Sequence, residues 1–91
     1  MIISLEEVKL YLRVDSDEEN ALITSLIKTA EEICEDILRF PLTDFTDLPE
    51  IVKHAILFAV GNMYEEREKL DMKIIQDVMI RLLLSYRKES W

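Results

Sequence analysis

The chain has 91 residues, 49% of them hydrophobic and 33% charged, with a formal net charge of −8 at pH 7. This length suits one domain, 1–91, and the composition excludes a disordered chain, while one glycine and two prolines leave little turn chemistry for an all-β fold. The acidic excess argues against tight binding to a nucleic-acid backbone or to an anionic membrane.

The charge is unevenly distributed along the chain. Residues 1–47 carry four basic and twelve acidic groups, whereas residues 48–91 carry seven of each. The single cysteine, Cys34, excludes an internal disulfide and fits a reducing compartment. The first residues lack the basic start and the long apolar core of a signal peptide, so we expect the protein to stay in the cell that makes it.

A short helix is predicted near the start of the chain, over residues 5–12. Ser4 fits its N-cap, and Glu7 stands three residues later, where a capping box places a side chain that reaches back to the cap. The apolar residues that follow recur at helical spacing, so one face of this helix should be buried.

A longer amphipathic helix is predicted over residues 17–39. The acids in the segment 15–20 are favourable at a helix N-terminus, and the apolar residues that follow fall at helical spacing. The same acids resemble a calcium loop, but Asn20 and Leu26 stand where that loop needs glycine and glutamate. Helix capping is therefore the favoured interpretation, and the other charged residues of the helix are expected to face solvent.

The third predicted helix, over 49–69, organises the chain. Phe40-Pro41 ends the helix before it, because a residue that precedes proline is pushed out of the helical region. Pro49 begins the third helix, with Asp47 or Leu48 as its cap. Its first part is apolar on most faces, so we expect other helices to cover it from several sides. The run is too short to span a bilayer.

Two residues in or near this helix, Phe45 and Gly61, each allow two interpretations. Phe45, in the loop before it, is either a plug on the core or an exposed contact. Gly61 lies inside the helix, where glycine costs about 1 kcal/mol relative to alanine. Either this cost is simply tolerated, or a neighbouring helix approaches closely at this position.

A fourth helix is predicted over 73–87, with Asp71 as a plausible cap and Arg87 and Lys88 favouring its C-terminal dipole. The predicted fold is thus an all-α, small four-helix domain with a buried central helix. No repeat or linker interrupts it.

The sequence offers few parts for catalysis. Cys34 falls in an apolar stripe and His54, the only histidine, lies on another helix, so the cysteine is read as a small buried hydrophobe. The chain lacks a glycine-rich phosphate loop, metal-ligand spacing and a serine–histidine–acid pattern. We therefore expect neither an enzyme nor a site for a metal or cofactor.

Three segments in this order and spacing resemble the phage head–tail connector, or adaptor, family of tailed phages and prophages. They are SLEEVKLYLRVDSDEENALITSLIKTAEEICEDIL, then LPEIVKHAILFAVGNMYEERE, and a closing LLLSYR, which together cover most of the chain. The sequence departs from the family pattern at Glu66, where asparagine is frequent, and at Ser85, where proline is common. The segment between the second and third helices is also short.

The resemblance implies a helical protomer that assembles into a ring, typically dodecameric. Such a ring docks beneath the portal protein after DNA packaging, extends the DNA tunnel and receives the next head-completion (stopper) or tail protein. The protein would be made in the bacterial host cytoplasm and reside in the virion at the head–tail junction, with no catalysis, cofactor or membrane. An acidic lumen would let DNA pass without specific binding. Alternatively, the acids simply keep the monomer soluble.

Five residues near the ends of the third and fourth helices are candidate interface residues, and at least one of them is expected to contact a neighbouring subunit or the portal. They are Tyr64, Arg67, Tyr86, Arg87 and Trp91, whose residue types are enriched at interface hot spots. The competing function is that of a small acidic regulatory protein that binds another protein, possibly by mimicking the charge of DNA.

Overall fold

A computed structural model describes residues 2–66 and 68–87 of the chain. The described residues form α1 (Leu5–Leu12), α2 (Asn20–Leu38), the short 3-10 helix η1 (Leu42–Asp44), α3 (Glu50–Glu65) and α4 (Met72–Leu83), and contain no strand. The prediction of an all-α fold with four helices is therefore confirmed.

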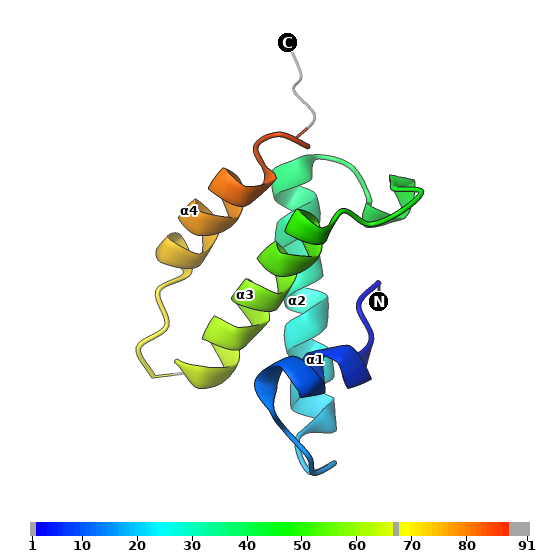
Figure 1. The fold of residues 1–91 in the computed structure, drawn as a ribbon. Helices are drawn as coiled ribbons and strands as arrows, with labels where there is room; N and C mark the ends of the chain where they lie inside the picture. Colours follow the sequence, from blue (N-terminus) through cyan, green and yellow to red (C-terminus); the bar gives the residue numbers. More distant parts are fainter. Residues whose placement is uncertain (1, 67, 88–91) are drawn as a thin grey trace.

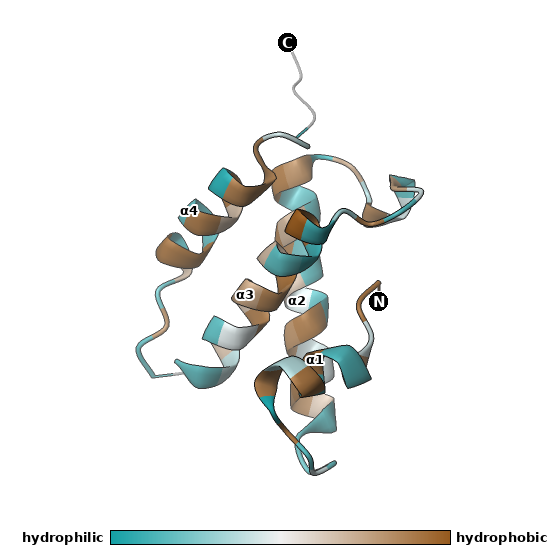
Figure 2. Cartoon of the chain, viewed as in Figure 1, coloured by the Kyte–Doolittle hydropathy of each residue, from teal (hydrophilic) through white to brown (hydrophobic). Residues whose placement is uncertain are grey.

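The third helix is central, as its apolar run predicted. α3 packs against α2 and α4 and also contacts α1, and α2 and α4 touch each other (Figure 1). Hydrophobic segments run along all three of the longer helices (Figure 2). The buried residues of α3 are Val52, Ala55, Ile56, Leu57, Ala59, Val60 and Met63. Within the described residues, none of the helices combines the length and apolarity needed to cross a membrane.

Two of the predicted helix caps are confirmed. The Ser4 hydroxyl accepts a hydrogen bond from the Glu7 backbone N–H at 3.1 Å, and the Asp71 carboxylate accepts one from the Lys73 N–H at 3.0 Å. The Glu7 side chain, however, pairs with Lys53 of α3 at 3.0 Å. The reciprocal half of the capping box is replaced by an ion pair between α1 and α3.

The starts of α2 and α3 differ from the prediction. α2 begins at Asn20 and not at residue 17. The Asp17 carboxylate lies before the helix, where it accepts hydrogen bonds from the Lys9 ammonium and the Asn20 side-chain amide. The N-cap of α3 is Pro49, which has no side-chain cap, so neither Asp47 nor Leu48 serves. At its other end α2 stops at Leu38, followed by Arg39 in the left-handed conformation.

The ends of α3 and α4 come earlier than predicted. α3 stops at Glu65 and not at residue 69, because the charged residues after Met63 give a further turn no apolar face to bury. α4 stops at Leu83, and the backbone N–H groups of Tyr86 and Arg87 both donate to the Leu83 carbonyl in a tight turn. Residues 84–86, which were predicted to belong to this helix, therefore form a turn after it.

Two acids of α2 bind backbone groups of other segments, although both were expected to face solvent. Oε2 of Glu31, which is only 8% exposed, accepts hydrogen bonds from the N–H groups of Ile2 and Ile3, each at 2.9 Å. Oε2 of Glu35, one turn later, accepts one from the Leu42 N–H at 2.7 Å. These carboxylates fix the N-terminal segment and the start of η1 on α2.

The single glycine lies where another helix approaches. A Cβ placed on Gly61 would come within 3.3 Å of Cε2 of Tyr11, a residue of α1. The structure thus favours the close-approach interpretation of this glycine.

Gly61→Ala is expected to raise the free energy of unfolding by about 0.5–1 kcal/mol, because alanine is the better helix former. The Tyr11 side chain, in a residue that is 53% exposed, has room to move by the few tenths of an ångström that the new methyl group needs. Urea denaturation measures the change. A midpoint below that of the wild type would show that Tyr11 is held firmly and that the close contact requires glycine.

Candidate interface surfaces

The five predicted interface residues do not form one patch. Tyr64 lies at the end of α3, whereas Tyr86 and Arg87 follow the end of α4. Because α3 and α4 run in opposite directions, these two places are at opposite ends of the helix pair (Figure 1). Arg67 and Trp91 lie outside the described residues.

Tyr64 is half-buried and bonded within its own protomer. Its hydroxyl donates to Oε1 of Glu19 at 2.5 Å, which ties the end of α3 to the segment before α2. The hydrogen bond to Glu19 shows a structural use for this hydroxyl that the sequence did not indicate.

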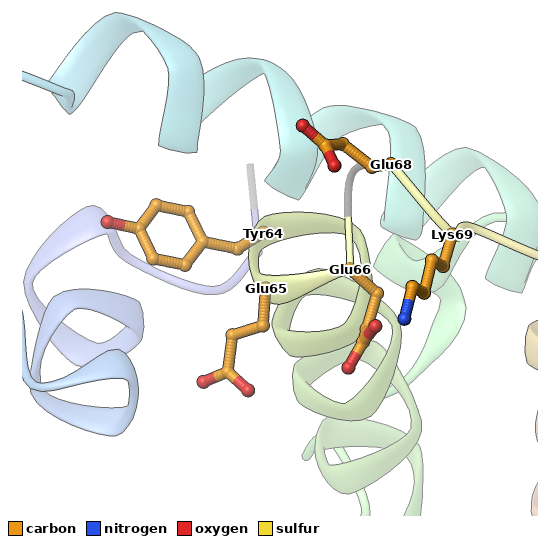
Figure 3. Close-up of a pocket in the computed structure, with 5 residues that line it drawn as sticks. All are labelled: Tyr64, Glu65, Glu66, Glu68 and Lys69. Atoms are coloured by element: carbon orange, nitrogen blue, oxygen red, sulfur yellow. The ribbon is translucent and has the colours of Figure 1, made fainter.

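A shallow hollow of about 560 Å³ adjoins Tyr64. Its other lining residues are Glu65, Glu66, Glu68 and Lys69, and the tyrosine ring extends away from the side chains of Glu65 and Glu66 (Figure 3). The hollow is acidic. Throughout residues 2–66 and 68–87, no group of three or more His, Cys, Asp or Glu side chains is placed to hold a metal ion.

Tyr86 belongs to an aromatic cluster. Its ring meets Phe45 edge-on at a centroid distance of 6.0 Å, and Phe45 meets Phe40 in the same manner at 5.2 Å. Phe45 is partly buried and packs against the core, so it acts as a plug. The cluster holds the turn after α4 against the loop between α2 and α3.

A groove of about 260 Å³ lies between the C-terminal part of α2 and α4. It is lined by Ile33, Asp36 and Ile37 of α2, Gln76 and Ile80 of α4, and Arg87. The Nε atom of Arg87 is buried and has no hydrogen-bond partner among the described residues. Helical spacing alone did not indicate this groove. The available signal in the sequence was Ile80, at the edge of the apolar stripe of α4.

α1 exposes the most accessible large apolar side chain of the described residues. Leu10 is 81% exposed and lies opposite the buried Val8 on this helix. The exposed acid Glu6 lies one turn before Leu10 on the same face. We refer to Glu6 and Leu10 together as the α1 ridge. Helical spacing did not indicate this ridge, because Leu10 lies away from the buried face of α1.

Two ion pairs near the surface link α1 to other segments. The ammonium of Lys9 lies 2.8 Å from the Asp17 carboxylate and donates a hydrogen bond to it. This bond lowers the pKa of the Asp17 carboxyl, and a hydrogen bond from the Asn20 amide has a smaller effect in the same direction. The hydrogen bond from Lys53 to Glu7 raises the pKa of the Lys53 ammonium. Because they lie near the surface, these pairs mainly orient α1 and contribute little to stability.

The Cys34 thiol is buried, whereas the His54 imidazole is exposed. Cys34 is fully buried, and its pKa is raised to about 12, chiefly by desolvation and secondarily by Glu35 and Glu31. Its thiol is therefore protonated at neutral pH and a poor nucleophile, as expected of a core cysteine. His54 is exposed on α3, and its Nε2 lies 3.9 Å from the Glu50 carboxylate.

Comparison with known proteins identifies one match. A family model described as "Phage gp6-like head-tail connector protein" matches residues 2–88 of the chain. No curated protein and no solved structure matches. The matched residues include all four helices, the α1 ridge and the groove.

Proposed function

The chain belongs to the phage gp6-like head–tail connector family, and we propose that it forms a ring beneath the portal protein and extends the DNA tunnel toward the tail. The family match over residues 2–88 carries this proposal. Membership supports a structural connector role in the phage virion. The finer claims proposed here are the ring, typically dodecameric, its position under the portal after DNA packaging, and its contact with a stopper or tail protein.

The charge of the described residues is compatible with a DNA passage. The acidic excess lies in the first half of the chain, where the exposed acids are Glu6, Asp15, Asp17, Glu18, Glu32, Asp36, Asp44 and Asp47. Carboxylates repel DNA phosphates, so a lumen that presents some of them would let DNA slide through without being held.

The contacts between copies, or with the portal, are proposed to use at least one of Tyr64, Arg67, Tyr86, Arg87 and Trp91. Tyrosine, arginine and tryptophan are enriched at hot spots because they bury a large area and can also form hydrogen bonds. Among the described members, Arg87 is the strongest candidate. It is partly exposed and lines an open groove, so its guanidinium would be within reach of a carboxylate of another copy.

The proposed function is tested by disrupting the gene in the phage or prophage that carries it. We expect DNA-filled heads without tails in electron micrographs, and recovery of infectious particles when the wild-type gene is supplied in trans. The control is disruption of a tail gene, which also leaves tailless heads but retains this chain in purified heads by mass spectrometry. Normal tailed particles after disruption would contradict the proposal and favour the acidic regulatory protein.

A further inference from the structure

We propose that the α1 ridge of one copy docks into the α2–α4 groove of the next copy, with Leu10 between the isoleucines and Glu6 paired with Arg87. This inference rests on the proposed ring and names the two surfaces that would join its subunits. The occupant of the groove is thus a second copy of this chain.

The groove suits an aliphatic side chain that has a carboxylate next to it on the same surface. Ile33 and Ile37 line it from α2, and Ile80, which is partly exposed, lines it from α4. A leucine between these side chains would remove apolar surface from water on both copies. Arg87, which is partly exposed, lines the same groove. Its guanidinium would meet a carboxylate that lies beside the inserted leucine.

The α1 ridge presents those two groups together. Leu10 is 81% exposed, so nearly all of its apolar surface is available for a second copy to cover. Glu6 precedes it by four residues, so the two side chains are neighbours on the helix surface. A carboxylate one turn from the inserted leucine can accept hydrogen bonds from a guanidinium at the edge of the groove.

The two surfaces are at opposite ends of α2. α1 lies near the start of that helix, and the groove lies near its end, beside the last turn of α4 (Figure 1). A protomer therefore cannot fill its own groove with its own ridge. A contact between two unlike surfaces is heterologous, and repetition of such a contact builds a ring when the rotation closes.

The test places one new thiol on each surface. Leu10→Cys and Ile80→Cys are made in separate chains, mixed at high concentration and oxidised with copper phenanthroline. We expect mostly a mixed disulfide dimer, and a ladder of covalent oligomers from the chain that carries both substitutions. The buried Cys34 remains as the only thiol of the wild-type control, which should stay uncross-linked. The matched control pairs Leu10→Cys with Ser25→Cys, an exposed position on α2.

A charge exchange tests the second half of the contact. Arg87→Glu in the Ile80→Cys chain should reduce the mixed dimer severalfold, and Glu6→Arg in the Leu10→Cys chain should restore it. Circular dichroism confirms that each variant is folded. Cross-linking no greater than in the Ser25→Cys control, groove-to-groove dimers in place of mixed ones, or loss of the mixed dimer that Glu6→Arg does not restore, would each overturn the docking.

The virion assay separates this inference from the function on which it rests. If Leu10→Asp and Ile80→Asp chains still restore tailed particles in the disrupted phage, the docking is wrong while the connector function stands. If gene disruption itself leaves particles normal, the function fails, whatever the cross-links show. We expect both aspartate variants to fold and to fail in restoring infectivity.

Discussion

Ile56→Ala is expected to lower the free energy of unfolding by about 2–5 kcal/mol, the usual cost of truncating a large buried aliphatic side chain. Ile56 is 0% exposed and lies on α3, which contacts all three other helices. The substitution removes contacts and leaves a cavity in the centre of the core. In a domain with a total stability of about 5–15 kcal/mol, this loss is a large share.

Denaturant unfolding followed by circular dichroism measures the effect. The matched control is Ile51→Ala, the same substitution on the same helix at a residue that is 39% exposed, which should cost much less. Equal midpoints for the two variants would mean that Ile56 is not a core residue.

Glu31→Ala is expected to destabilise the protein by about 2–3 kcal/mol, because it removes the acceptor of two backbone hydrogen bonds. The N–H of Ile3, a residue that is only 1% exposed, would be left buried without a partner. Ile2 is more exposed, so water can replace part of its bond. The N-terminal segment should therefore detach before the rest of the fold.

Two measurements separate this local effect from a general loss of stability. Amide hydrogen exchange at Ile3 should accelerate more than exchange in α3, and Glu31→Gln, which keeps a neutral acceptor, should lose only part of the stability. Glu32→Ala is the control, since Glu32 is the exposed neighbour on the same helix. If Glu31→Ala and Glu32→Ala are equally stable, the buried carboxylate does not anchor the segment.

The arrangement of helices could be predicted because the signals are local. The apolar run around Ile56 specified a covered helix, and the caps Ser4 and Asp71 were recognisable from their side chains alone. The positions at which α3 and α4 end, Glu65 and Leu83, could not be predicted, because they depend on how much apolar surface a further turn could bury. The prediction of the α3 cap was also wrong, because the N-cap is Pro49 and no side chain caps this helix.

The polar contacts were beyond prediction for a related reason. Glu31 lies among acids of the same type, and only the path of the N-terminal segment makes it an anchor. Tyr64 and Tyr86 looked equivalent in the sequence, yet the antiparallel helices separate them, and each finds a partner of its own in Glu19 or Phe45. Residue type alone did not show which side chains already have a bonding or packing partner within the protomer.

The length of α2 has a consequence for the curvature of the proposed assembly. Its 19 residues form one uninterrupted helix, which spans about 28 Å at the usual rise per residue. If the proposed docking surfaces near its two ends join the copies, this helix would act as a stiff spacer, and the angle between the two surfaces would set the arc that each subunit contributes. The number of subunits in a closed ring would then follow from the tilt of α1 and α4 on α2. Substitutions in the ion pair between Lys53 and Glu7, which orients α1, would alter the ring size without touching either docking surface.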